Sequence, residues 1–262
     1  MGIINTTPDS FSDGGQFVNY ETAIKYGLLL AEQGADILDI GGESSRPGAA
    51  EVSIQEELDR VIPVIEGLQE KTETPISIDT TKPEVMTAAV KAGASLVNDI
   101  NGLRASGAIE AVANANVPVC IMHMLGQPKT MQQSPQYHNV TDEVISFLDE
   151  RIKECTANGI SKNNIIIDPG IGFGKSLDHN LTLLSALPEI KSKLQCELLI
   201  GVSRKSMIDG LLGRPVEERL SASLGLVVQA RLNGAKILRV HDVRATFDAI
   251  KSVEAVLDKQ TN

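Results

Sequence analysis

Short apolar runs alternate with longer stretches of helical periodicity along the whole chain. Eight runs, each bounded by turn-forming residues, are typical of buried strands. These strands are expected at Gly2–Ile4, Asp36–Ile40, Pro75–Asp79, Ala94–Asp99, Val117–His123, Asn164–Asp168, Glu197–Val202 and Ala235–His241. The stretches between them repeat apolar residues three and four positions apart, which predicts amphipathic helices. These helices are expected at Glu21–Gln33, Ile54–Leu68, Val85–Lys91, Ala108–Ala115, Val144–Thr156, Asn180–Leu187, Val216–Leu232 and Val243–Leu257.

This order of elements predicts an α/β fold, a TIM (β/α)8 barrel that forms a single domain over residues 1–262. Eight strand–helix units in about 250 residues are typical of that barrel. Gly34, Gly93 and Gly234 each follow a predicted helix, where glycine supplies a left-handed cap. Pro83 stands at a first-turn position, which proline tolerates. A doubly wound sheet is the alternative, and it is less favoured because such sheets usually have fewer strands.

The composition narrows the class of protein without identifying its function. The net charge of −10 argues against nucleic-acid and membrane-surface binding, because both need a basic footprint. A small anionic substrate is still compatible, since it responds to a local cluster of cations. Cys120, Cys155 and Cys196 are odd in number and lack metal-like spacing, which predicts reduced thiols and a cytoplasmic location. No apolar run approaches the ~20 residues that a membrane-spanning helix needs.

The last predicted strand carries Arg239 and His241 two positions apart, and therefore on one face. Burying a guanidinium and an imidazole without partners is energetically costly. We therefore expect an anionic ligand at the end of this strand. The alternative is a pair of structural residues whose polar groups are satisfied within the protein.

Polar side chains occur at the carboxyl end of every predicted strand, where a TIM barrel places its reacting groups. These positions are Asn5, Gly41–Pro47, Asp79, Asn98–Asp99, His123, Asp168–Gly170, Ser203–Ser206, Arg239 and His241. A single polar strand end is commonly a cap or a salt bridge. A complete ring of them predicts a binding site on one rim of the barrel.

One group of these side chains suits phosphate oxygens, because arginine presents a planar fork of donors to them. The group comprises Arg46, Arg239 and His241. Asn5 is the candidate magnesium ligand, since magnesium is commonly held by a side-chain oxygen, substrate phosphates and water. The alternative role of Asn5 is to initiate the turn that leads into Thr6–Pro8.

A second group suits a flat heterocycle that is rich in donors and acceptors. A carboxylate can accept two parallel N–H bonds, while lysine and asparagine match carbonyl oxygens and ring nitrogens. The group comprises Asp79, Asn98, Asp168 and Lys205. Two alternatives stay open: Asp168 as a turn-former before Pro169, and Lys205 as a solvated surface lysine. His123 is interpreted as a packed interior histidine, not as a catalytic residue.

Two long polar loops at the same end of the barrel are candidate lids that close over a substrate. They span Thr6–Gln16 and Glu43–Ala50. Phe11 in the first loop stands out because aromatic residues make up only 3% of the chain. We interpret Phe11 as one wall of a pocket for a second substrate.

These motifs resemble the dihydropteroate synthase family, the folate-pathway enzymes that sulfonamides inhibit, over essentially the whole chain. The two longest and most specific motifs are Met1–Gly15 and Gly41–Gly48. The others follow in order at Ile78–Thr80, Val97–Asp99, Met122–Met124, Asp168–Lys175, Ser203–Ser206 and Arg239–His241. Ser45 stands where the family usually has threonine, so the hydroxyl is kept and the methyl group is lost.

The resemblance implies that 6-hydroxymethyl-7,8-dihydropterin diphosphate and 4-aminobenzoate are joined to 7,8-dihydropteroate, with release of diphosphate. It implies that the pterin is held by Asp79, Asn98, Asp168 and Lys205, of which Asp79, Asp168 and Lys205 are the candidate catalytic residues. The diphosphate is implied to lie on Arg46, Arg239 and His241, with magnesium on Asn5. The residues implied to border the aminobenzoate are Phe11, Pro47, Phe173 and Ser206, and Ser45 is a further candidate for substrate binding. The family is typically homodimeric.

The residue set is compatible with a dissociative substitution. Diphosphate is a good leaving group once magnesium and arginine neutralise its charge. Asp79 and Asp168 would stabilise the pterin methylene cation, which the aniline nitrogen then attacks. No side-chain nucleophile is required, so positioning and charge stabilisation are the main contributions.

Three other functions stay open. A pterin-dependent methyltransferase shares the barrel and the pterin carboxylates but does not need the Arg239–His241 pair or the Ser203–Ser206 loop. A Schiff-base aldolase that uses Lys205 would be trapped by borohydride with a carbonyl substrate. A binding-only barrel would bind pterins without releasing diphosphate.

Overall fold

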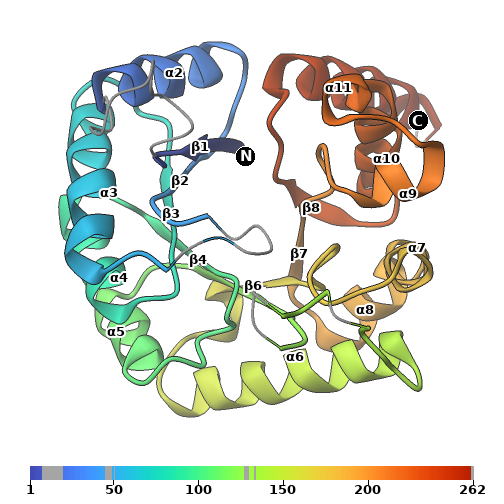
Figure 1. Ribbon diagram of the computed structural model, residues 1–262, viewed down its shortest axis with the longest axis horizontal. Coiled ribbons are helices and arrows are strands. Elements are labelled where there is room, and N and C mark those ends of the chain that lie inside the picture. The colour runs from blue at the N-terminus through green and yellow to red at the C-terminus, as the bar shows by residue number, and fades with distance from the viewer. Residues whose placement is uncertain (8–19, 45–48, 50, 127–129, 133, 261–262) are drawn as a thin grey trace.

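The computed structural model describes residues 1–7, 20–44, 49, 51–126, 130–132 and 134–260 (Figure 1). Its strands form one parallel sheet in chain order, and each strand pairs with the next. They are β1 (Gly2–Asn5), β2 (Leu38–Gly41), β3 (Ile76–Asp79), β4 (Leu96–Asp99), β5 (Val119–Met122), β6 (Ile165–Asp168), β7 (Glu197–Ile200) and β8 (Ala235–Leu238). All eight predicted strands are present, although most are shorter than predicted.

The sheet closes on itself just beyond β8. The N–H of Ile3 donates to the Val240 carbonyl at 3.1 Å, and the N–H of Val240 donates to the Met1 carbonyl at 3.0 Å. Gly2 and Val240 form a parallel bridge. A closed ring of eight parallel strands confirms the predicted TIM barrel and excludes the doubly wound alternative, whose sheet stays open.

Helices form an outer ring around the strands, as Figure 1 shows. They are α2 (Tyr20–Glu32), α3 (Ile54–Gln69), α4 (Pro83–Ala92), α5 (Ala108–Ala115), α6 (Val140–Ala157), α7 (Leu177–Ser185), α8 (Leu187–Leu194), α9 (Met207–Leu212), α10 (Leu220–Leu232) and α11 (Val243–Gln260). Short 3-10 helices η1 and η2 lie at Lys162–Asn164 and Val216–Glu218. The structure corrects several predicted elements. The helix predicted over Val216–Leu232 is split into η2 and α10, and α8 and α9 were missed. Some strands end early, and β8 stops at Leu238 instead of His241.

Local chemistry explains where several helices begin and end. The Ser53 hydroxyl accepts from the Glu56 N–H and caps α3, and Ser176 forms a capping box with His179 at the start of α7. Pro83 is the first residue of α4, as predicted. Gly93 follows α4 with a φ of +121°, a backbone conformation that is open to glycine and strained for other residues.

The core has two layers. Apolar residues on the outer faces of the strands pack against the helices. Inside the barrel lies a separate, smaller apolar layer, to which alternate strand residues contribute. It comprises Met1, Ile37, Leu96, Cys120, Ile166, Leu199 and Ile237. This layer fills the interior of the barrel. A ligand can therefore bind only above it, at the carboxyl ends of the strands, which we call the mouth of the barrel.

The three cysteines are buried and free of disulfide bonds, and burial raises the pKa of each thiol. They are therefore poor nucleophiles and poor metal ligands. Among the described residues, no helix combines the length and apolarity that crossing a membrane requires.

Candidate active site

The candidate site lies directly above the inner apolar layer, on the same strand faces. Residues two positions further along a strand return to the same face, and here they are polar. They are Asp39, Asn98, Asp168 and Arg239, which follow Ile37, Leu96, Ile166 and Ile237. The alternation that fills the barrel with apolar side chains therefore also directs these polar groups into its mouth.

Arg239 lies between two carboxylates at this mouth. Its Nε donates to Asp39 Oδ2 at 2.6 Å, and its Nη2 donates to Asp79 Oδ2 at 2.7 Å. The Asn98 amide donates to Asp39 Oδ2 at 3.3 Å. We call Asp39, Asp79, Asn98 and Arg239 the acid–arginine cluster. The protein itself supplies counter-charges to Arg239, as the alternative of polar groups satisfied within the protein required.

Asp39 is the functional candidate that the sequence analysis missed. Its side chain is fully buried, it accepts from both Arg239 and Asn98, and its Oδ1 has no hydrogen-bond partner in the described part of the chain. A buried acceptor without a partner is rare in proteins and costly, so it calls for an explanation, and a role in the site is one. The available signal was one acidic residue within the apolar run Ile37–Ile40, on the inward face.

Crowding of carboxylates changes the protonation of this cluster. Burial raises the pKa of Asp79 to about 7, although Arg239 opposes this shift, and the nearby Asp39 carboxylate adds to it. One guanidinium thus faces two carboxylates. The pKa of Arg239 is raised by the same two neighbours against the effect of its own burial, so Arg239 stays charged.

The opposite side of the mouth is built from Asp168 and Lys205. Asp168 Oδ1 accepts from the Gly170 N–H at 2.7 Å, so this residue does form the turn that precedes α7. Lys205 Nζ donates to the Ile171 carbonyl and lies 4.6 Å from the centroid of the Phe173 ring. Lys205 is therefore a positioned site residue and not a solvated surface lysine.

Charge also links this side of the mouth to the acid–arginine cluster. Burial raises the pKa of Asp168, and Lys205 and Arg239 both oppose that shift through their charges. Burial lowers the pKa of Lys205 to about 8. A Cβ added at Gly201 would lie 3.8 Å from the Arg239 Cβ and 3.9 Å from Lys205 Nζ. The structure therefore brings Asp79, Asn98, Asp168, Lys205 and Arg239 to one mouth.

His241 and Ser206 lie at the edge of this mouth. His241 Nδ1 is 3.1 Å from the Ser203 hydroxyl, which also accepts the His241 N–H at 3.2 Å. These contacts fix the imidazole beside the loop that carries Lys205. Ser206 is exposed and precedes the first residue of α9.

Asn5 ends β1 at the same rim and is half-buried. Its side chain has no hydrogen bond within the described residues, so its amide oxygen is available to a ligand. The described residues contain no group of three or more His, Cys, Asp or Glu that could hold a metal ion. A single amide oxygen fits magnesium, which keeps water and substrate oxygens as most of its ligands.

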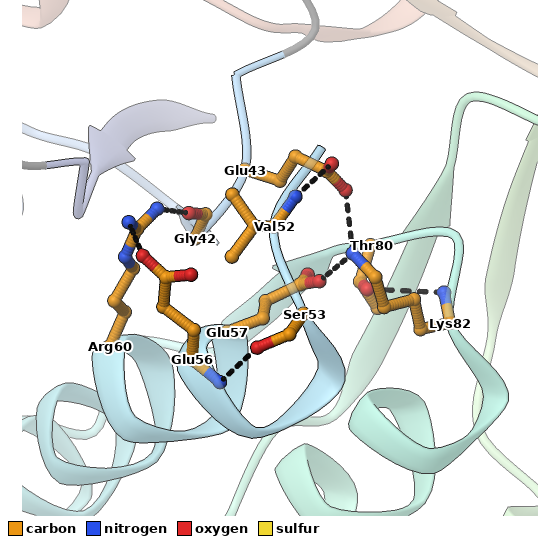
Figure 2. A network of polar contacts seen from close by, with 9 residues as sticks. All are labelled: Gly42, Glu43, Val52, Ser53, Glu56, Glu57, Arg60, Thr80 and Lys82. Atoms are coloured by element: carbon orange, nitrogen blue, oxygen red, sulfur yellow. Dashed lines mark hydrogen bonds and ion pairs between the residues drawn. The ribbon is translucent and has the colours of Figure 1, made fainter. Parts of the chain in front are cut away.

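A network of charged side chains, shown in Figure 2, holds the two ends of the loop between β2 and α3. Glu43 accepts from the Val52 N–H at 3.0 Å and from Lys82 Nζ at 2.6 Å. Lys82 also binds the buried Glu57 of α3. The two ends of this loop are thereby joined to each other and to the starts of α3 and α4.

Several predicted site residues lie outside the described residues. They are Phe11, Ser45, Arg46 and Pro47. Most of the two predicted lid segments, Thr6–Gln16 and Glu43–Ala50, also lies outside. Thr6 is described, and its buried hydroxyl donates to the Gly41 carbonyl at 3.0 Å, which fixes the beginning of the first segment.

Comparison with known proteins agrees with this geometry. The model of the family described as pterin binding enzyme matches residues 1–241. A dihydropteroate synthase of Escherichia coli K12 is 51% identical over 262 residues, which cover 100% of this chain and 93% of the relative.

Two solved structures superpose closely. The dihydropteroate synthase of Yersinia pestis, in complex with a sulfonamide drug, has a TM-score of 0.94 at 49% identity and covers 98% of this chain and 94% of its own. The enzyme of Xanthomonas albilineans with 4-aminobenzoic acid has a TM-score of 0.93 at 52% identity and covers 98% and 92%.

Proposed function

The chain belongs to the pterin-binding enzymes, and within them to the dihydropteroate synthases, and we propose that the described barrel mouth carries out their reaction. The enzyme transfers the pterin-methyl group of 6-hydroxymethyl-7,8-dihydropterin diphosphate to 4-aminobenzoate, which yields 7,8-dihydropteroate and diphosphate for folate synthesis. The observation that carries the site assignment is the acid–arginine cluster facing Asp168 and Lys205 across one mouth. A relative with half of its residues identical over the full chain favours this activity over methyl transfer, aldol chemistry and binding alone.

The pterin is recognised by groups whose donors and acceptors complement its edge. Asp168 uses Oδ1 for the Gly170 N–H, which leaves Oδ2 to accept from the amino-pyrimidine edge. Lys205 and Asn98 supply donors for the carbonyl oxygen and a ring nitrogen. Because Lys205 is already fixed against Ile171, little side-chain freedom is lost when the ring binds.

The diphosphate binds at the cationic edge of the same mouth. Arg239 uses Nε and Nη2 for Asp39 and Asp79, and its Nη1 makes no hydrogen bond within the described residues. The two carboxylates hold the guanidinium plane, and Nη1 donates to a phosphate oxygen. Arg46 and His241 complete the diphosphate site, as the family resemblance implies.

The reaction is a dissociative substitution. The C–O bond between the pterin methylene and the diphosphate breaks, and its electron pair leaves with the diphosphate. The resulting cation lies beside Asp79 and Asp168, whose negative charges stabilise it. The amine of 4-aminobenzoate then forms the C–N bond and loses a proton to the departing diphosphate, so no side chain forms a covalent bond.

Magnesium is the cofactor that this chemistry calls for. Asn5 would hold the ion through its amide oxygen, together with water and diphosphate oxygens, and the ion would neutralise the leaving group. Removal of magnesium is expected to abolish diphosphate release while pterin binding persists. The residues of this chain still orient both substrates without the ion.

The test is to incubate the purified chain with dihydropterin diphosphate and 4-aminobenzoate, with and without magnesium. We expect diphosphate and dihydropteroate in equal amounts, and competition between a sulfonamide and 4-aminobenzoate. Diphosphate without dihydropteroate, or neither product, would contradict the proposed function.

We also propose that residues 1–262 form one domain that assembles as a homodimer. The chain exposes apolar side chains along η2, α9 and α10, including Leu211, Leu212, Val216 and Leu220. Such a patch is typical of an interaction surface. Light scattering after gel filtration should give twice the monomer mass, and Leu220→Glu should shift the protein towards monomer.

A cytoplasmic location is proposed from the three cysteines, which remain thiols in the fold. Oxidising compartments favour disulfides, whereas the cytosol keeps thiols reduced. Cell fractionation with an antibody against the chain tests this location, and recovery with a secreted fraction would contradict it.

A further inference from the structure

The loop from Pro169 to Ser176, which joins β6 to α7, is held in place by side chains that bind its backbone. We call it the β6–α7 loop. Besides the Asp168 and Lys205 contacts, Asn180 accepts the Gly172 N–H at 2.7 Å and Gln132 donates to the Gly172 carbonyl at 2.6 Å. Tyr137 donates to the Gly174 carbonyl at 2.9 Å. A glycine-rich loop without regular structure is thereby given one conformation.

Lys175 is the most unusual of the residues that hold this loop. Its side chain lies inside the protein, with only 3% of the residue exposed. Its Nζ is 3.0 Å from His123 Nδ1 and 3.0 Å from the Phe173 carbonyl. Burying an ammonium group is costly, and here burial lowers its pKa to about 7. A lysine kept in such a place usually has a specific role.

His123 acts as the acceptor for this lysine. Burial lowers the pKa of His123 to about 3, and the Lys175 charge adds to the effect, so the imidazole is neutral and Nδ1 can accept. The ring is held edge-on against Phe147, with centroids 5.0 Å apart. His123 follows β5, so Lys175 connects the end of one barrel strand to the loop that follows the next.

Phe173 is held from two directions. Its carbonyl accepts from Lys175, and its ring lies 4.6 Å from the Lys205 ammonium. The same ring packs against the buried cluster of Met122, Met124 and Met131. The position of this ring therefore depends partly on Lys175, which reaches it through the backbone carbonyl of Phe173.

We infer that Lys175 is a positioning residue for the second substrate: by linking His123 to the Phe173 carbonyl, it fixes the aromatic ring against which 4-aminobenzoate binds. This inference rests on the proposed function and on the family resemblance, which implies that Phe173 borders the aminobenzoate. Lys175 does not touch the substrate. It acts through Phe173 and is distinct from Lys205, which faces the pterin.

The test compares Lys175→Met with a matched control, Lys153→Met, which removes an exposed lysine that pairs with Asp149 on α6. We expect Lys175→Met to raise the KM for 4-aminobenzoate about tenfold and to change the KM for dihydropterin diphosphate by less than about threefold. The control should leave both constants unchanged. An equal rise in both constants, or no rise, would overturn the inference.

A double-mutant cycle shows whether Lys175 acts through Phe173. In a Phe173→Leu background, adding Lys175→Met should raise the aminobenzoate KM by less than about twofold, because the ring it positions is absent. If the double variant raised the aminobenzoate KM by the product of the two single-variant effects, the inference would be contradicted. If Lys175→Met fails to fold, His123→Leu removes the acceptor instead, and His123→Asn restores an oxygen near the place of Nδ1 and should return the wild-type aminobenzoate KM.

These outcomes separate the inference from the proposed function. A wild-type chain that releases no diphosphate would refute the function itself. A wild-type chain that makes dihydropteroate, with a Lys175→Met variant of unchanged aminobenzoate KM, would refute only the role of Lys175.

Discussion

Charged side chains hold one another on the β2, β3 and β8 side of the barrel mouth, whereas on the β6 side they hold backbone groups. In the acid–arginine cluster, Arg239 joins Asp39 and Asp79 directly; Asp39 lies within β2, Asp79 ends β3 and Arg239 follows the last residue of β8. In the glycine-rich β6–α7 loop, the backbone carbonyls accept hydrogen bonds from two lysines, Lys175 of the loop itself and Lys205 from the loop after β7.

This difference follows from what each side must do. A ligand that carries its own charge needs counter-charges that are already oriented, and rigid strands provide them. A flat aromatic ring such as that of 4-aminobenzoate needs a shaped wall to pack against, which a loop can form only if its backbone is fixed. We therefore assign pterin diphosphate chemistry mainly to the cluster and aminobenzoate placement mainly to the loop.

Replacement of Arg239 should have the largest effect. Arg239→Met leaves the Asp39 and Asp79 carboxylates close together without a counter-charge, and removes a diphosphate ligand. We expect kcat/KM for dihydropterin diphosphate to fall about 1,000-fold. The free energy of unfolding should fall by about 3 kcal/mol, as when one partner of a buried ion pair is removed.

Arg239→Lys is the matched control for charge. It keeps one cation but cannot bind two carboxylates through a planar fork, so it should recover stability better than activity. Steady-state kinetics and urea unfolding on the same preparations check both values. Wild-type kcat/KM in Arg239→Met would remove the cluster from the mechanism.

Asp39→Asn should have the next largest effect, although this residue is absent from the sequence-based candidates. The amide keeps the shape but loses the charge that orients Arg239, so we expect kcat/KM for dihydropterin diphosphate to fall about 100-fold. Asp36→Asn, three residues earlier and outside the cluster, is the control. A change of less than threefold in Asp39→Asn would show that Asp39 is only a structural partner of Arg239.

The pH dependence of stability tests Asp79. Its folded-state pKa of about 7 lies above the reference value of 3.8, so the folded protein holds this proton more tightly than the unfolded chain. The stabilisation is complete below pH 3.8 and is lost as the pH rises through 7. Urea unfolding near pH 5 and near pH 8 should therefore show a larger decrease for wild type than for Asp79→Asn.

Asp79 should also shape the pH profile of activity, because its ionised form stabilises the methylene cation. The wild-type kcat should rise as the pH increases through about 7, and Asp79→Asn should lose that rise together with about 100-fold in kcat. A variant with turnover within about twofold of wild type would rule out the charge-stabilising role.

Loss of one contact to the β6–α7 loop should have the smallest effect. Tyr137→Phe removes one hydrogen bond to the Gly174 carbonyl, while other side chains, among them Lys175, Asn180 and Gln132, still hold the backbone. We expect unfolding to become easier by about 1 kcal/mol and the aminobenzoate KM to change by less than about twofold. A large rise in this KM would mean that loss of any single contact displaces the loop, and that Lys175 contributes no more than the other side chains.

The barrel could be predicted from the sequence because each strand is a short apolar run between turn residues, and because polar residues recur at the strand ends. It did not reveal α8, since Leu187–Leu194 starts directly after α7 and contains Pro188. It also concealed Asp39, because an acidic residue inside an apolar run looks like part of a buried strand.

The partners of Arg239 could not be read from the chain. Asp39 lies 200 positions away, and only closure of the barrel brings β8 beside β1 and β2. The same holds for Lys175, whose neighbour His123 is 52 positions earlier. Sequence patterns predicted which polar residues stand at the strand ends. The contacts between polar residues of different strands could be seen only in the three-dimensional structure.

The most direct test of this division is to measure both Michaelis constants side by side for Asp39→Asn and Lys175→Met. We expect opposite patterns: Asp39→Asn impairs use of dihydropterin diphosphate and leaves the aminobenzoate KM within about twofold, while Lys175→Met does the reverse. If both variants change both constants to the same extent, the mouth acts as one undivided site, and the division between cluster and loop is wrong.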